Sequence, residues 1–224
     1  MIYESRLVSS EPVAEGTMAF HFERPSIFKF RSGQNVMVTL IDPPESDAKG
    51  PSRIFTIASA PHEPRITIAT RMRDSAFKRV LKTAPPGLRV KIDGPDGQMT
   101  LHEDPARPAV FLAGGIGITP FLSMARDAAA RNLPHRIVLL YSNRSIEDAP
   151  FLSELKRLEQ DNRNFQLVGT ELIRRELLER HVADITAPIY YMAGPPAMTM
   201  AMQSMLAECG VAEGDTRYEE FYGY

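Results

Sequence analysis

The sequence contains almost no cysteine, since Cys209 is the one thiol among its 224 residues. One thiol cannot form an internal disulfide, a cysteine-rich zinc site or a cysteine-ligated iron–sulfur cluster within the chain. The five histidines lack the spacing of metal ligands, and no G-x-S-x-G nucleophile elbow occurs. The composition therefore argues against a metal centre and a serine hydrolase, and the near absence of cysteine favours a cytoplasmic protein.

A marked excess of one charge is also missing, because 26 lysines and arginines stand against 28 aspartates and glutamates, a net charge of −2. Binding to a phosphate backbone needs a basic excess, so nucleic acid is not an expected partner. No apolar run approaches the ~20 residues of a membrane span. Residues 1–6 lead into an alternating pattern and not into a signal-peptide core. We therefore expect no membrane insertion.

The first hundred residues have the period of β-strands. Apolar residues alternate in three segments that are separated by turns rich in glycine, proline and aspartate, namely residues 17–22, 35–40 and 65–69. Many short strands at close spacing predict a small antiparallel barrel. One helix interrupts it, because Asp74 or Ser75 can cap a segment that carries Phe77, Val80 and Leu81 on one face.

The pattern changes after about residue 105, where continuous apolar runs alternate with segments of helical period. This alternation is typical of parallel strands buried on both faces between helices. The expected strands are residues 109–113, 137–141, 165–168 and 189–192, and the expected helices are residues 120–132, 150–158, 172–181 and 197–208. A polar, proline-bearing stretch at 101–108 separates the halves. We predict two domains, 1–104 and 105–224, the second an α/β doubly wound parallel sheet.

A glycine-rich turn follows the first apolar strand of the second half. It reads Gly114-Gly115-Ile116-Gly117-Ile118-Thr119-Pro120. Glycines allow close approach of the backbone to a ligand, and the start of the following helix favours a diphosphate. The segment differs from the G-x-G-x-x-G fingerprint, so a tight turn needed only for packing is the alternative. A second turn, Ala193-Gly194-Pro195-Pro196, ends another buried strand, and two such turns would bracket a long ligand or simply cap helices.

The segment Arg53-Ile54-Phe55-Thr56 lies on a strand of the barrel half, where Arg53 and Phe55 share one face. Arginine is a forked phosphate donor, an exposed phenylalanine stacks on a planar ring, and a threonine hydroxyl donates to a ring nitrogen. A barrel strand with one surface arginine is the simpler alternative.

These three segments together resemble the signatures of the ferredoxin–NADP⁺ reductase-like flavoenzymes. Residues 53–56 resemble their R-x-Y/F-S/T strand, residues 114–120 their G-G-x-G-x-T-P turn, and residues 193–196 their C-G-P-P segment. The order and spacing agree over essentially the whole chain. The resemblance implies an antiparallel Greek-key β-barrel with one helix that binds FAD, followed by a doubly wound domain that binds NAD(P).

For the flavin, the resemblance implies that Arg53 pairs with the diphosphate, Phe55 packs on the isoalloxazine or ribityl region, and Thr56 hydrogen-bonds near N5. The main chain of the next strand would meet the pyrimidine edge, and the helix start after it would receive the diphosphate; these segments are Ile68-Ala69-Thr70-Arg71 and Asp74-Ser75-Ala76. The family often has glycines where Met72-Arg73-Asp74 stands here, so an acid lies close to the expected diphosphate.

At the C-terminus, Glu220 and Phe221 resemble the family's acidic residue near the flavin and its aromatic cover. Thr56 and Glu220 are thus the implied catalytic residues. Tyr224 is an alternative cover, a partner for the FAD adenine, or part of a frayed terminus.

For the nicotinamide dinucleotide, the resemblance implies a cradle of Gly114, Gly115, Gly117 and Thr119. The adenosine ribose is expected at Ser142-Asn143-Arg144, where serine and arginine suit a 2′-phosphate and favour NADPH over NADH. Stacking of the arginine on adenine would discriminate nothing. Ala193 replaces the cysteine that the family usually places beside nicotinamide C4.

The implied activity moves a hydride from NAD(P)H to FAD and then single electrons to a separate soluble carrier. A [2Fe–2S] ferredoxin is the first candidate, and a flavodoxin or an oxygenase component is an alternative. Such carriers are acidic, so we expect a basic rim from Arg71, Arg73, Lys78, Arg79 and Lys82. Two other functions stay open: an NAD(P)H:flavin or quinone reductase that acts on a small acceptor, and a non-catalytic FAD-binding relay subunit.

Overall fold

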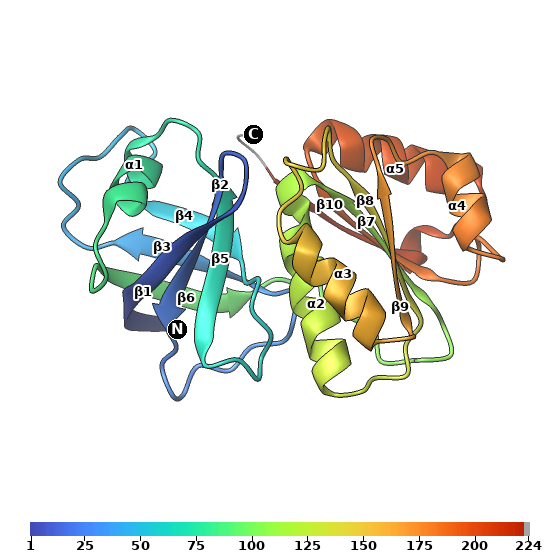
Figure 1. Ribbon diagram of the computed structural model, residues 1–224, viewed down its shortest axis with the longest axis horizontal. Coiled ribbons are helices and arrows are strands. Elements are labelled where there is room, and N and C mark those ends of the chain that lie inside the picture. The colour runs from blue at the N-terminus through green and yellow to red at the C-terminus, as the bar shows by residue number, and fades with distance from the viewer. Residues whose placement is uncertain (222–224) are drawn as a thin grey trace.

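The computed structural model describes residues 1–221, which form two halves side by side (Figure 1). The N-terminal half is a curled, six-stranded antiparallel sheet, ordered β4-β3-β6-β1-β2-β5. Its strands are β1 (Ile2–Ala14), β2 (Thr17–Glu23), β3 (Asn35–Leu40), β4 (Ser52–Thr56), β5 (Arg65–Arg71) and β6 (Arg89–Asp96). Alternate residues such as Phe20, Val38 and Ile66 fill the inside of the half-barrel. Helix α1 (Ala76–Thr83) adds Phe77 and Leu81 to that core.

Sequence patterning did not identify β6 or β1, which is the longest strand of the half-barrel. Its pairing with β2 is irregular between Leu7 and Ser9 and again between Pro12 and Ala14. Each irregularity shifts the alternation of faces by one residue, so the apolar period of two is lost. In the sheet, β1 lies between β6 and β2, although its sequence does not alternate regularly between apolar and polar residues.

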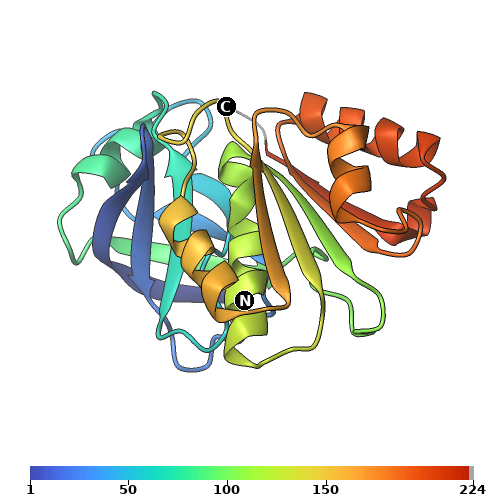
Figure 2. The ribbon, with the colours of Figure 1, turned by 45° about the vertical axis from the view of Figure 1, so that its right-hand side comes forward.

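The C-terminal half is a five-stranded parallel sheet, ordered β11-β10-β7-β8-β9. Its strands are β7 (Ala109–Gly114), β8 (Ile137–Ser142), β9 (Phe165–Thr170), β10 (Ile189–Gly194) and β11 (Thr216–Glu220). Helices α2 (Ile118–Ala130) and α3 (Leu152–Asp161) cover one face, and α4 (Arg175–His181) and α5 (Pro196–Glu208) cover the other (Figure 2). Short 3₁₀ turns occupy Gly115–Gly117 and Glu213–Asp215. The predicted pair of an antiparallel barrel-type half and a doubly wound parallel sheet is confirmed.

Helix α2 lies between the half-barrel and the parallel sheet, as both ribbon views show. Ser123 Oγ donates to the Ser59 carbonyl at 2.7 Å, and Arg126 donates to the Ala58 carbonyl at 3.1 Å. Because these contacts are buried or half-buried, the two halves are held in one relative position. The connection between them follows Asp96 and ends at Ala109, and the expected boundary between residues 104 and 105 lies within it. Over residues 1–221, no helix has both the length and the apolar character of a membrane span.

Candidate active site

A cleft of about 770 Å³ opens where the two halves meet. The half-barrel contributes β3, β4, the end of β5 and the start of α1, and the C-terminal half contributes the glycine turn and β11. Many of the predicted site residues line this one cleft, namely Arg53, Ile54, Phe55, Thr56, Ala69, Thr70, Asp74, Ser75, Ile116, Thr119, Glu220 and Phe221. Segments more than 150 residues apart in the sequence thus meet at a single site, as the hydrogen bond between Thr56 and Glu219 shows.

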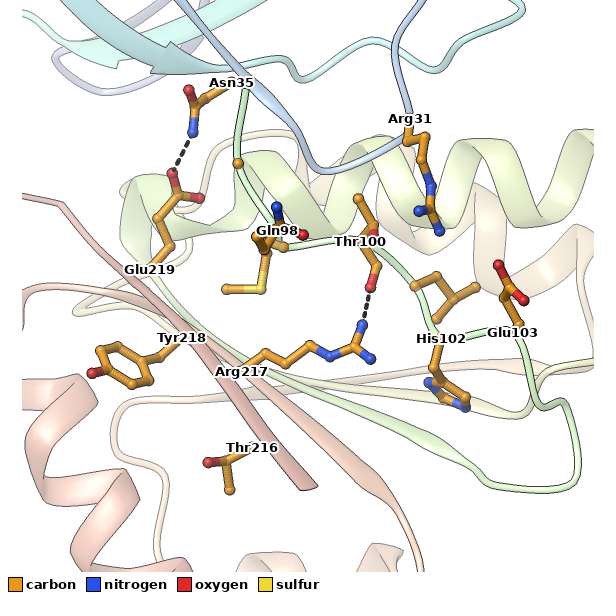
Figure 3. Close-up of a pocket in the computed structure, with 13 residues that line it drawn as sticks. Arg31, Asn35, Gln98, Thr100, His102, Glu103, Thr216, Arg217, Tyr218 and Glu219 are labelled. Carbon is orange, nitrogen blue, oxygen red and sulfur yellow. Dashed lines mark hydrogen bonds between the residues drawn. The ribbon is translucent and has the colours of Figure 1, made fainter. Parts of the chain in front are cut away.

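Thr56 contacts an acid from the other half of the molecule. Its Oγ1 donates to Glu219 Oε2 at 3.2 Å. Asn35 Nδ2 donates to Glu219 Oε1 at 3.5 Å (Figure 3). Asn35 and Thr56 are paired residues on β3 and β4, so the half-barrel presents both donors at one point of the cleft. The carboxylate therefore fixes the direction of the Thr56 hydroxyl.

The expected acid was Glu220, and the structure places its neighbour Glu219 against Thr56 instead. Glu220 also lines the cleft, but its Oε1 accepts from Thr199 Oγ1 at 3.4 Å on α5. Neighbouring residues of β11 point to opposite faces, and a sequence that reads Glu-Glu does not show which one faces the flavin side. Phe221 lines the cleft as expected, and Tyr224 lies outside the described residues.

Burial raises the pKa of Glu219, and the hydrogen bonds from Thr56 and Asn35 offset only part of that effect. A carboxyl with a higher pKa in the folded protein binds its proton more tightly there than in the unfolded chain. The free energy of unfolding should therefore fall as pH rises from the usual glutamate pKa through the raised folded value, and then level off. We expect this component to be absent in Glu219→Gln, measured by urea unfolding of the apoprotein from about pH 4 to about pH 8. Parallel curves for the two proteins would contradict it.

A second cavity of about 770 Å³ adjoins the cleft and shares Asn35, Gly97 and Glu219 with it (Figure 3). Arg217 projects into this region from β11 and donates to the Thr100 carbonyl. The carboxylate of Glu219 thus borders both spaces.

Strand β4 places Arg53 and Phe55 against the same ring, that of Phe77. The Phe55 ring is only 9% exposed and packs against Phe77 at 5.7 Å between ring centres, so it forms a wall of the half-barrel core. The expected exposed ring for stacking is therefore not found, and Ile54, at 63% exposure, is the open side chain of the segment. Arg53 does line the cleft, with its guanidinium 5.4 Å from the Phe77 ring centre.

The start of α1 supplies anion donors beside Arg53. Ser75 is the N-cap, and its Oγ accepts the Lys78 N–H at 3.3 Å. Asp74 points to Arg79 instead and is 84% exposed, so it is not the cap. The Ala76 N–H donates to Asp47 at 3.0 Å, a contact that sequence patterning did not anticipate.

The end of β5 reaches the cleft. Ile68 is fully buried in the half-barrel core. Ala69 and Thr70 line the cleft.

The two glycine turns lie directly against each other. A Cβ on Gly117 would fall 2.1 Å from the Ala193 carbonyl oxygen, and one on Gly114 would fall 2.4 Å from Met198 Sδ. These glycines are required by packing, which was the alternative interpretation, and they also bring the ends of β7 and β10 together. Ile118 and Pro120 are buried inside the domain, while Ile116 and Thr119 reach the cleft.

Gly115 has a different environment, since its φ of +53° suits glycine and its open side faces Arg71. A Cβ there would lie 3.4 Å from Arg71 Nη2. Within the described residues, the Arg71 side chain forms no ion pair or hydrogen bond with an acid. Arg71 thus brings a free cation from β5 to the nucleotide turn. The sequence signal for this position of Arg71 was that it directly follows Ile68-Ala69-Thr70, the strand expected at the flavin. We had expected Arg71 on a basic rim for the electron carrier.

The expected adenosine segment ends β8. Ser142 Oγ donates to the Glu171 carbonyl at 2.8 Å, the Asn143 N–H donates to the Thr170 carbonyl at 3.0 Å, and Arg144 is exposed. In the second turn, Ala193 is fully buried, and Pro195 and Pro196 are half-buried. Among Ser142, Asn143 and Arg144, the exposed side chain that could contact a phosphate is therefore that of Arg144.

The expected basic rim is only partly available. Arg79 pairs with Glu45 and Asp74, and Lys78 Nζ donates inward to the Arg71 carbonyl at 2.7 Å. Burial lowers the pKa of Lys78, and the nearby Arg73, Arg53 and Lys49 lower it further. Arg73 and Lys82 remain exposed.

The residues of the cleft fit a flavin dinucleotide. The Arg53 guanidinium and the start of α1 line the cleft and suit a diphosphate, and Thr56 lines it as well. A cleft of this volume can hold the flavin ring system. Among residues 1–221, no group of three or more histidine, cysteine or acidic side chains is placed to bind a metal ion.

Comparison with known proteins gives the same assignment. Residues 111–204 match the oxidoreductase NAD-binding domain family. The chain is 30% identical over 207 residues to ferredoxin–NADP reductase B of Sorangium cellulosum, covering 87% of this chain and 83% of that protein. It is 28% identical to one component of the Na⁺-translocating NADH-quinone reductase of Methylococcus capsulatus, over 80% of this chain and 51% of that protein. The chain thus spans about half the length of some curated relatives.

Solved structures share the whole fold. A ferredoxin NADP⁺ reductase from Neisseria gonorrhoeae with bound FAD and NADP superposes with a TM-score of 0.81 at 19% identity, over 98% of each chain. The FAD/NAD-binding domain of nitric oxide dioxygenase from Vibrio cholerae gives 0.83 at 18% identity, over 97% of this chain and 98% of that one. With the sequence match above, these findings show that the chain belongs to the ferredoxin–NADP⁺ reductase-like family of NAD(P)H-dependent, FAD-containing oxidoreductases.

Proposed function

We propose that this reductase passes electrons from NADPH, through FAD in the cleft, to a separate soluble carrier, for which a [2Fe–2S] ferredoxin is the best candidate. The observation that carries the proposal is the contact between Thr56 and Glu219, which joins the flavin strand to β11 beside the glycine turn. FAD supplies the chemistry, because a flavin accepts a hydride and gives up electrons singly.

The half-barrel residues hold and orient the flavin. Arg53 and the Ala76 N–H at the start of α1 bind its diphosphate, since a forked cation and a helix N-terminus both favour an anion. Thr56 lies at the reacting end of the cleft. Glu219 accepts the hydrogen bond of the Thr56 hydroxyl and so would hold that hydroxyl in one orientation beside the bound flavin ring. Phe221 lines the cleft and would shield the flavin ring from water.

The glycine turn and Arg71 hold the nicotinamide dinucleotide. The turn at Gly115 gives a phosphate close access to the backbone, and the Arg71 guanidinium lies at the same point. Arg144, exposed after β8, suits a 2′-phosphate and supports NADPH as the donor.

Replacing Arg71 by glutamine should raise the KM for NADPH about tenfold, because a charge-assisted phosphate contact contributes about 1.5–3 kcal/mol. Affinity for FAD should stay within about twofold, since Arg53 and Ala76 remain. Steady-state kinetics with a dye acceptor and a flavin titration measure the two effects. Lys82→Gln, which removes an exposed cation from the far end of α1, serves as the control. An equal rise in KM for both variants would contradict a specific contact.

A separate carrier is proposed because this chain has a single cysteine. Relatives include methane monooxygenase component C of Methylosinus trichosporium and a glycine betaine monooxygenase reductase subunit of Pseudomonas aeruginosa. Exposed Lys49 and Arg73 line or border the cleft mouth and suit an acidic carrier.

The function is tested by mixing the FAD-loaded protein anaerobically with NADPH and, separately, with NADH. Rapid bleaching of the flavin supports the reductase. A yellow protein that neither nucleotide reduces would instead support a relay subunit. Adding a ferredoxin and a cytochrome reporter then identifies the acceptor, and turnover with free flavin or quinone alone would favour a small acceptor.

A further inference from the structure

An acid of the chain itself occupies the centre of the proposed diphosphate site. Asp47 lies in the loop between β3 and β4, outside every predicted motif. Its Oδ2 accepts the Ala76 N–H at 3.0 Å, and its Oδ1 accepts the Lys49 N–H at 2.9 Å. Arg53 Nη2 donates to both carboxylate oxygens, at 3.1 and 3.3 Å.

These donors are the ones that the proposed function assigns to the flavin diphosphate. An arginine fork and the first N–H of a helix are well suited to an anion, and here the anion is a side chain. The other terminal nitrogen of Arg53, Nη1, donates to the carbonyls of Lys49, Gly50 and Ser52 in the same loop. The loop thus holds the arginine at both terminal nitrogens.

Several basic side chains gather around this contact. Lys49, Arg73 and Lys78 line the cleft with Arg53. The other three cations depress the pKa of Lys78 in addition to its burial. Asp74 lines the same cleft but pairs with Arg79, so Asp47 is the carboxylate that contacts Arg53. A diphosphate carries about two negative charges and presents more acceptor oxygens, so it can replace the carboxylate on these donors.

We propose that Asp47 is an internal substitute for the flavin diphosphate, which holds Arg53 and the start of α1 in the apoprotein and must leave both when FAD binds. The inference rests on the proposed assignment of Arg53 and Ala76 to the diphosphate. Because FAD has to displace a charged partner, Asp47 weakens retention of FAD. It does not affect a flavin that lacks phosphate, since the isoalloxazine end of the cleft lies at Thr56.

The test compares Asp47→Asn and Asp47→Ala with the wild-type chain in titrations of the apoprotein with FAD and with riboflavin, followed by flavin fluorescence. We expect both variants to bind FAD about tenfold more tightly, a difference of about 1.4 kcal/mol. Riboflavin affinity should stay within about twofold, because riboflavin makes no phosphate contact. The apoprotein variants should also unfold at lower temperature than the wild type, since they lose the half-buried ion pair.

Glu45→Gln is the matched control, because it removes an equal charge from the same loop, from an acid that pairs with Arg79 and not with Arg53. It should change FAD affinity by less than about twofold. Arg53→Gln should weaken FAD binding whether residue 47 is aspartate or asparagine. FAD affinity that is unchanged or lower in both Asp47 variants would overturn the proposal, as would an equal gain for riboflavin or for Glu45→Gln.

Failure of the proposed function and failure of this inference give different results. If Asp47 is the substitute anion, the shift in FAD affinity appears even in a protein that NADPH does not reduce. Conversely, a wild-type flavin that NADPH bleaches rapidly, with no gain in FAD affinity in the Asp47 variants, would leave the reductase intact and remove this inference.

Discussion

Replacing Gly117 by alanine should destabilise the C-terminal domain by about 3 kcal/mol and slow flavin reduction by about 10²-fold. The added Cβ would lie 2.1 Å from the Ala193 carbonyl oxygen and 2.8 Å from the Gly194 nitrogen. Both are backbone atoms, which no side-chain rotation can move aside. The ends of β7 and β10 must then separate, and the two turns no longer present one surface to the nicotinamide dinucleotide.

Urea unfolding and stopped-flow reduction by NADPH measure the two effects of Gly117→Ala. Gly169→Ala is the control, because that glycine lies on β9 and a Cβ there would meet no atom within 4 Å. The control should be neutral or stabilise the fold by a few tenths of a kcal/mol, as a smaller loss of backbone entropy predicts. Similar behaviour of the two variants would show that the turns do not need their close approach.

Replacing Thr56 by alanine should slow flavin reduction by about 10²-fold while FAD affinity stays within about threefold. Thr56 is 3% exposed and Glu219 fixes the direction of its hydroxyl, so that hydroxyl is a preorganised polar group at the reacting end of the cleft. Its loss removes a contact that is aligned before reaction, whereas the diphosphate contacts that dominate FAD retention are untouched.

Single-turnover bleaching with NADPH and a flavin titration separate these two quantities. Thr39→Ala is the control, since Thr39 bonds Ser52 at 2.8 Å on the neighbouring strand and lies away from the reacting end. Thr56→Ser should restore most of the rate, because it keeps the hydroxyl. A reduction rate for Thr56→Ala equal to that of Thr39→Ala would remove Thr56 from the reaction.

Local sequence was sufficient for most of the architecture. Apolar alternation located β2, β3 and β5, and continuous apolar runs located β7, β8 and β10, because burial on one or both faces leaves a direct record in the residue pattern. The irregular pairing of β1 disrupts this alternation, so the strand could be identified only from its pairing with β2 and β6 in the structure.

The site was harder to predict from the sequence because its chemistry depends on contacts between distant segments. Motif spacing placed Arg53 and Thr56 on one strand, but the choice between Glu219 and Glu220 depends on which face of β11 meets the half-barrel. Phe55 was expected to be open, and the packing of α1 buries its ring against Phe77.

The sequence by itself determined the two-domain order, the nucleotide turns and the absence of a thiol-ligated centre, since each follows from residue types at short spacing. Only the tertiary structure decided which acid touches Thr56, that Arg71 faces Gly115, and that Asp47 holds Arg53. Such contacts form between residues that share no sequence period, so the packing of the two halves and the path of one loop select them.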